Sequence, residues 1–250
     1  MLAAWAIALA GSGVALAADP PKPAPRSPTA KATAPRYATY VRDWHATPTA
    51  PPPADQATGR PLLAVVSLNT RDRIEILPAS DKGGFSARDL DRLSYVLRDS
   101  SNGNQHPIEP RLVDLVYRIQ VHFHAPELRV ISAYRTPRRG GTSNHGRGRA
   151  IDMIVPGTSD QELAKFAREQ GFSGVGIYPT SGFVHVDVRE RSYFWVDTSG
   201  PGKRSRIRGI LADLAQKSDS QALARGERSV GPFLVGTDVN AVVGVAPAAP

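Results

Sequence analysis

The chain has 250 residues, of which 41% are hydrophobic, and a formal net charge of +8. This length allows one medium domain with extended arms or two small domains. The absence of cysteine excludes disulfides, thiolate nucleophiles and cysteine-rich metal sites. The positive charge favours anionic partners, but we expect no nucleic acid among them, because the sequence contains no helix-turn-helix pattern, zinc finger or basic motif interleaved with aromatic residues.

Residues 1–18 are expected to form a signal peptide. An apolar run ends in Ala15-Leu16-Ala17, which matches a small-x-small cleavage pattern. The run is too short for a membrane span, which needs about 20 apolar residues. No lysine or arginine precedes it, so a misplaced start codon and an uncleaved apolar arm are the alternatives. We therefore expect an exported protein, periplasmic or secreted, without a membrane span.

A Pro/Ala-rich segment over residues 19–61 predicts a semi-extended linker, because it cannot bury enough apolar surface to fold. Folding is expected to begin with a strand over 62–68 and its hairpin partner over 73–77. A capping pattern at Ser86, followed by leucines at helical spacing, predicts the first helix.

Helical and strand patterns then alternate along the chain. Further helices are expected over 110–122 and from a cap at 159 to about 170, and strands over 128–134, 150–155, 174–178, 183–188 and 193–196. Such mixing predicts an α+β domain over 62–200, built on an antiparallel sheet with packed helices. A C-terminal extension over 201–250 is expected to hold a polar helix near 207–214 and to be partly disordered.

Two histidines and an aspartate form a candidate metal site. His185 and Asp187 are two residues apart on a predicted strand, so their side chains point to the same face. Asp152 lies among apolar strand residues, where a carboxylate is costly unless a cation or hydrogen-bond donors meet it. His145 lies in a loop with two glycines. Three ligands with an open fourth position are typical of hydrolytic zinc sites.

Each of these residues has a simpler interpretation when it is taken alone. A histidine in a glycine loop is usually exposed, and a strand aspartate often accepts backbone hydrogen bonds. The rival pair His122 and His124 lacks a third ligand and is expected at the surface. No Ser-x-x-Lys or His-Glu-x-x-His motif is present, so neither a serine penicillin-binding mechanism nor the commonest zinc-protease helix is supported.

The motifs around these residues resemble those of a known family, the zinc D-alanyl-D-alanine carboxypeptidase superfamily, which also contains the VanX dipeptidases and the hedgehog fold. The resemblance is closest to its murein endopeptidase K-like branch and covers roughly residues 62–195. The motifs that carry it are Ser132-Ala-Tyr-Arg135, Ser143-x-His145, the seven-residue step to Asp152, and Phe183-Val-His185-Val-Asp187.

The resemblance implies a zinc peptidase that hydrolyses amide bonds in peptidoglycan stem peptides or cross-links, of either L,D or D,D type. It implies that the zinc ligands are His145, Asp152 and His185. Such a metal lowers the pKa of a bound water to about 7. Arg135 is expected to hold a substrate carboxylate or to steady the oxyanion, with a structural salt bridge as the alternative.

Three more residues are possible contributors. Ser143 and Tyr178 are candidates for hydrogen bonds to the substrate, although plain loop or core packing would explain both. Trp195 is expected in the core, with stacking against the substrate as the alternative.

The general base is left open by the sequence. Relatives in the carboxypeptidase and VanX branches carry a glutamate three residues before the last histidine, and this chain has Gly182 there. Asp187 is the candidate base, and orienting a ligand histidine is its alternative role. Gly182 also keeps open a different class of function, a non-catalytic, zinc-stabilised module that binds the cell wall.

Overall fold

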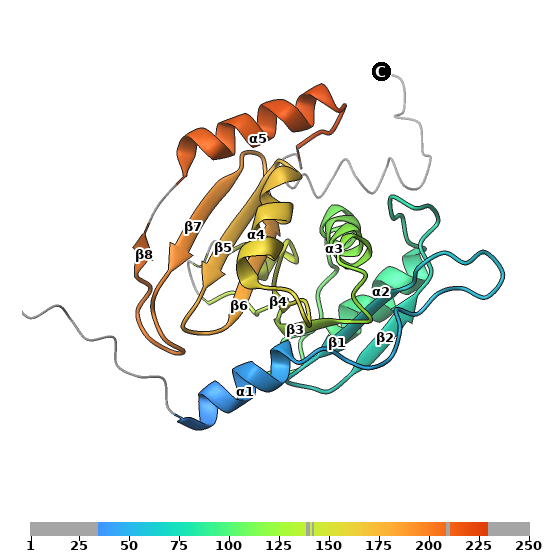
Figure 1. Cartoon of the computed structure of the whole chain (residues 1–250), viewed down its shortest axis with the longest axis horizontal. Coiled ribbons are helices and arrows are strands. Elements are labelled where there is room, and N and C mark those ends of the chain that lie inside the picture. Colours follow the sequence, from blue (N-terminus) through green and yellow to red (C-terminus); the bar gives the residue numbers. More distant parts are fainter. Residues whose placement is uncertain (1–34, 139–140, 142, 209–210, 230–250) are drawn as a thin grey trace, which may run out of the picture. The chain divides into compact units, whose positions relative to one another are not determined.

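A computed structural model describes residues 35–138, 141, 143–208 and 211–229 of the chain (Figure 1). The expected signal peptide over 1–18 and the end of the expected C-terminal extension, 230–250, lie outside the described residues. Within the described ranges, none of the helices has the length and apolar character needed to cross a membrane.

Eight strands form one mixed sheet in the order β2-β1-β3-β4-β6-β5-β7-β8. β1 runs parallel to β3 and β5 runs parallel to β7, and the other neighbours are antiparallel. The α+β class is therefore confirmed, with a sheet that is mostly rather than wholly antiparallel. The strands are β1 Leu63–Ser67, β2 Arg73–Ile76, β3 Leu128–Ser132, β4 Ala150–Ile154, β5 Ser173–Tyr178, β6 Phe183–Val188, β7 Tyr193–Asp197 and β8 Ile207–Arg208.

Helices α2 and α4 begin at serine caps. The Ser86 side chain accepts a hydrogen bond from the Asp89 backbone at the start of α2, and Ser159 and Glu162 form a complete capping box on α4. The helices are α1 Pro35–His45, α2 Ala87–Val96, α3 Pro110–His122, α4 Asp160–Glu169 and α5 Ala212–Ala224, with a short 3₁₀ helix η1 at Asn144–Arg147.

The two faces of the sheet have different roles. On β6, Val184, Val186 and Val188 belong to the apolar core, to which α2, α3 and α4 contribute. His185 alternates with these valines and therefore points to the opposite face. Asp152 of β4 pairs directly with His185, so it lies on that same face. Helices α3 and α4 lie on the core face of the sheet (Figure 1), and the metal ligands lie on the other face.

Helix α1 lies within the segment that was predicted to be a linker. Tyr37, Val41 and Trp44 recur at helical spacing, which the surrounding proline-rich composition obscures. The Tyr37 hydroxyl donates to the Ser181 carbonyl, and the Arg129 guanidinium donates to three carbonyls at the end of α1. These contacts with residues distant in sequence hold the helix on the domain.

The chain also continues to fold past residue 200. The polar helix predicted near 207–214 is wrong: residues 207–208 form β8 beside β7, and α5 starts at Ala212. The Asp219 carboxylate accepts hydrogen bonds from the backbone of Phe172 and from the backbone and hydroxyl of Ser192. These hydrogen bonds attach α5 to the segments just before β5 and β7. They join residues far apart in the sequence, so the local sequence pattern does not predict them.

Candidate metal centre

His145 is held rigidly by its own turn. The Ser143 hydroxyl accepts a hydrogen bond from the His145 backbone, and Gly148 closes η1 with a φ of +64°, in the left-handed region. The side chain is 2% exposed, and its Nδ1 lies 2.6 Å from the Ala133 carbonyl oxygen. A hydrogen on Nδ1 donates to that carbonyl, so Nε2 is left with its lone pair facing the site.

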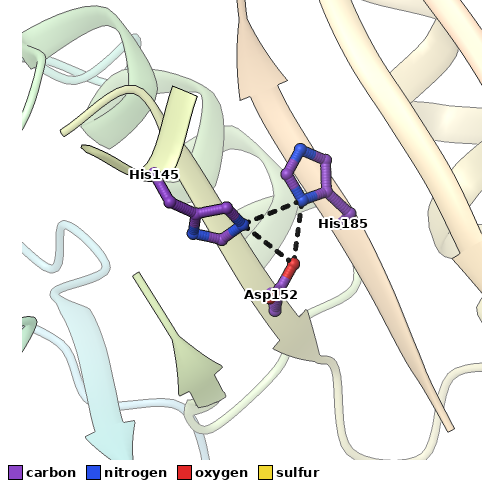
Figure 2. Close-up of side chains that lie close together, drawn as sticks. All are labelled: His145, Asp152 and His185. Carbon is purple, nitrogen blue, oxygen red and sulfur yellow. Dashed lines mark hydrogen bonds and ion pairs between the residues drawn. The ribbon is translucent and has the colours of Figure 1, made fainter. Parts of the chain in front are cut away.

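Asp152 and His185 face each other from adjacent strands. Asp152 Oδ1 lies 2.8 Å from His185 Nδ1 and 3.4 Å from His145 Nε2, and the two nitrogens are 3.2 Å apart. Figure 2 shows the three side chains converging, and all three are buried. The structure thus brings together the three predicted ligands, with their ligand atoms within 4.8 Å of one another.

The second ring nitrogen of His185 also has an acidic partner. Its Nε2 lies 3.0 Å from Oδ2 of Asp187, which is 1% exposed. The Asp187 carboxylate further accepts hydrogen bonds from the Gly174 backbone and, through both of its oxygens, from the Arg189 guanidinium. A Cβ at position 174 would collide with this carboxylate, so the glycine makes the contact possible.

These neighbours give the site a strong preference for positive charge. Burial lowers the pKa of His185, but hydrogen bonds to Asp152 and Asp187 outweigh it and raise the pKa to about 9. Burial likewise opposes ionisation of Asp152, but the two histidines hold its pKa well below the ordinary value. A buried carboxylate needs hydrogen-bond donors or a cation beside it, and a metal ion held by the same three side chains meets that need.

The comparison with protein families decides the assignment. The model of the family described as peptidoglycan L,D-endopeptidase MepK, an M15-type peptidase family, matches residues 55–193. The chain belongs to this family. The enzyme class inferred from the motifs, a peptidoglycan-hydrolysing metallopeptidase, is thereby confirmed, and the bond type that the sequence left open is L,D.

Individual relatives agree with the family match. The chain is 32% identical to the probable peptidoglycan L,D-endopeptidase MepK of Haemophilus influenzae over 140 residues, which cover 51% of this chain and 75% of that protein. It is 30% identical to the peptidoglycan L,D-endopeptidase MepK of Escherichia coli K12 over 152 residues, covering 55% of this chain and 84% of the relative. No solved structure matches the chain.

Arg135 reaches the centre of this MepK-family site from the segment after β3. Its guanidinium contacts Asp152 Oδ2 at 3.3 Å, and its side chain remains 55% exposed. The Thr136 backbone next to it donates to Asp99, a buried carboxylate in the loop after α2. Arg135 and the exposed Ser143 both line a cavity of about 560 Å³ between that loop and β3. The predicted substrate-binding residues therefore border open space.

Tyr178 and Trp195 form the other side of the site. The rings of Trp195 and His185 lie 5.2 Å apart, and Trp195 Nε1 donates to the Tyr178 hydroxyl at 3.2 Å. Trp195 is buried as expected, but it lies on the face of the metal ligands and not in the apolar core cluster. Its indole fills the space above Gly176, where a Cβ would collide with it.

Sequence reasoning missed Arg189 and the two strand glycines. Arg189 follows Asp187 at a spacing of two, so the alternation His185, Asp187, Arg189 could have indicated it. Gly174 and Gly176 alternate in the same way on β5, and glycine within a strand marks a place where a neighbouring group approaches closely.

Proposed function

We propose that His145, Asp152 and His185 bind zinc and that the chain uses it to hydrolyse L,D-peptide bonds in peptidoglycan. The observation that carries the proposal is the convergence of two imidazole nitrogens and one carboxylate oxygen in a buried site. This donor set suits zinc, and three protein ligands leave a position for water or substrate. Bound there, the metal supplies Lewis-acid activation of water and of the scissile carbonyl.

The chain's own contribution begins with the tautomers of the two histidines. If the Ala133 carbonyl accepts a hydrogen bond from His145 Nδ1 and Asp187 accepts one from His185 Nε2, both inward-facing nitrogens carry lone pairs. The role of Asp187 as the base stays a prediction. Burial opposes its ionisation, but hydrogen bonds from His185 and Arg189 outweigh it and lower its pKa. These contacts favour the orienting role.

Arg135 is proposed to bind the acidic part of the substrate. Stem peptides carry free carboxylates, and an exposed guanidinium binds a carboxylate bidentately. Arg135 touches Asp152 on one side and the 560 Å³ cavity on the other, so it can hold a peptide beside the metal ligands. Ser143, which lines the same cavity, and Tyr178, on the β5 side of the metal ligands, are proposed to add hydrogen bonds to the peptide.

The proposed substrate also bears on location. Peptidoglycan lies outside the cytoplasm, so a chain that acts on it works there. We propose that residues 1–18 direct export to the periplasm or the medium, and that the basic chain is then attracted to the anionic wall.

Cleavage of muropeptides containing an L,D cross-link, with and without a chelator, tests the proposal. We expect cleavage that stops with the chelator and returns when zinc is added. Metal analysis should find one zinc per chain, lost in His145→Ala and His185→Ala and retained in His122→Ala, whose ring stacks on Phe166. Zinc retained by both ligand variants would contradict the proposed site. Wall binding with zinc but without products would instead support the wall-binding module.

A further inference from the structure

Tyr178 lies on the face of the sheet that carries the metal ligands. In the pairing of β5 with β6, Gly176 is opposite His185 and Tyr178 is opposite Phe183. Residues two apart on a strand share a face, so the side chain of Tyr178 projects on the same side as that of His185. The tyrosine ring stacks on Phe183, with the ring centroids 4.5 Å apart.

Trp195 determines where the Tyr178 hydroxyl lies. The indole, including its Nε1, occupies the position that a Cβ of Gly176 would need, directly beside His185 in the sheet. Trp195 Nε1 donates to the Tyr178 hydroxyl at 3.2 Å. The hydroxyl therefore lies on the face of the metal ligands, beside the indole whose ring is 5.2 Å from that of His185. One aromatic contact, with Phe183, and one hydrogen bond, from Trp195, fix it there.

The hydroxyl has a hydrogen left to donate. An indole nitrogen is only a donor, so Tyr178 accepts from Trp195, and its own hydrogen points elsewhere. Among the described residues, the Trp195 bond is the one hydrogen bond that the Tyr178 hydroxyl makes. Burial raises the pKa of Tyr178; the Trp195 hydrogen bond opposes the rise and the charge of Asp152 adds to it. The phenol therefore stays protonated at neutral pH.

We propose that Tyr178 is a catalytic residue that donates a hydrogen bond to the carbonyl oxygen of the scissile L,D bond as that oxygen becomes negative. The inference rests on the proposed function. Water adds to the carbonyl carbon, the C–N bond breaks and the amine takes a proton, while the phenol keeps its own. A fixed donor aimed at developing charge stabilises the transition state more than the substrate.

Arg135 and Tyr178 then lie on opposite sides of the metal ligands and bind different parts of the peptide, a carboxylate and the reacting carbonyl respectively. Arg135 approaches Asp152 from the β3 side, whereas Tyr178 approaches from β5, and the charges of both Asp152 and Arg135 act on the Tyr178 pKa. Trp195 is a positioning residue in this scheme, because it acts by holding the Tyr178 hydroxyl in place.

The variant Tyr178→Phe tests the inference, because it removes the hydroxyl and keeps the ring on Phe183. Loss of one oxyanion donor lowers kcat by about 10²-fold to 10³-fold in other enzymes. We expect a loss of that order, with KM, zinc content and Tm unchanged. Tyr193→Phe is the matched control: its ring lies 5.5 Å from Trp195, and we expect wild-type kcat. Trp195→Phe should lower kcat by a smaller factor, because the Tyr178 hydroxyl remains but loses the hydrogen bond from Trp195 that positions it.

A binding measurement provides a readout apart from turnover. A phosphinate peptide mimics the tetrahedral oxyanion, so calorimetry should show weaker binding to Tyr178→Phe by about the same factor as the loss in kcat/KM. Affinity for the cleaved peptide should not change. If the wild type cleaves and Tyr178→Phe matches it, or if both ligands weaken equally, this inference alone is overturned. A wild type without chelator-sensitive cleavage overturns the proposed function as well.

Discussion

His185 lies between two carboxylates, and each of its ring nitrogens faces a different one. Nδ1 is 2.8 Å from Asp152 on the side of the metal site, whereas Nε2 is 3.0 Å from Asp187 on the other side. Arg189 and the Gly174 backbone fix Asp187 in turn. A carboxylate held this way orients the ring and sets which nitrogen carries the hydrogen, and such partners tune metal affinity.

We expect Asp187→Asn to weaken zinc binding by about 10-fold to 100-fold, because the amide is a poorer acceptor for the His185 Nε2 hydrogen and loses the ion pair with Arg189. Competition with a fluorescent chelator measures the affinity. Asp197→Asn is the matched control, since Asp197 is equally buried but, among the residues that the structure describes, accepts hydrogen bonds only from the 199–206 segment. Normal zinc affinity combined with a lost kcat would favour the role of Asp187 as the base.

At the scale of secondary-structure elements, local signals predicted most of the domain. Caps such as Ser86 and Ser159, and the alternation of valines with polar residues on β6, were sufficient to find α2, α4 and β6. The pairing of His185 with Asp187 followed from the same alternation. The sequence did not show that β4 lies beside β6, or that β5 is inserted between β6 and β7. Gly174 leaves room for the Asp187 carboxylate and Gly176 leaves room for the Trp195 indole, and both contacts arise because β5 lies between β6 and β7.

Helix α1 was not predicted because the proline-rich composition around it obscures its helical spacing, and residues distant in sequence hold it on the domain. Contacts with α1 also explain why position 182 is a glycine in this chain, where the carboxypeptidase and VanX branches have a glutamate. Gly182 has a φ of +70°, and a Cβ there would collide with Val41 of α1. His45, at the end of α1, also lies with Nε2 3.1 Å from the Gly182 carbonyl oxygen. A side chain at position 182 is therefore excluded by packing as well as by the backbone conformation.

Gly182→Ala should destabilise the protein more than Gly59→Ala does, although both glycines have nearly the same positive φ. The conformational cost is about 1–2 kcal/mol at either position. Position 59 has open space around it, whereas overpacking against Val41 adds about 1–3 kcal/mol at position 182. Urea unfolding measures both. Adding Val41→Ala should recover part of the extra loss, and equal costs at the two positions would contradict the packing explanation.

On the scale of the whole molecule, the fold extends beyond the residues that define the family. The family match covers 55–193, whereas α1 lies before it and β8 and α5 lie after it. α1 is attached through Ser181 and Arg129, and α5 through Asp219. Position 171 shows how closely α5 packs: Gly171 has a φ of +75°, and a Cβ there would collide with Ala222. These additions contact the segments that lead into β5, β6 and β7.

A chain cut to 62–200, the domain boundaries predicted from the sequence, should therefore be much less stable than a chain of residues 35–229. The cut removes the hydrogen bonds of Arg129 to α1, the pairing of β7 with β8, and all three hydrogen bonds of Asp219. At about 1 kcal/mol for each lost hydrogen bond, this is a large part of the ~5–15 kcal/mol that stabilises a typical domain. Urea unfolding at one fixed zinc concentration compares the two chains, because bound metal adds to apparent stability. Equal midpoints for the two chains would mean that α1, β8 and α5 contribute nothing to the fold, and their contacts would then need another explanation.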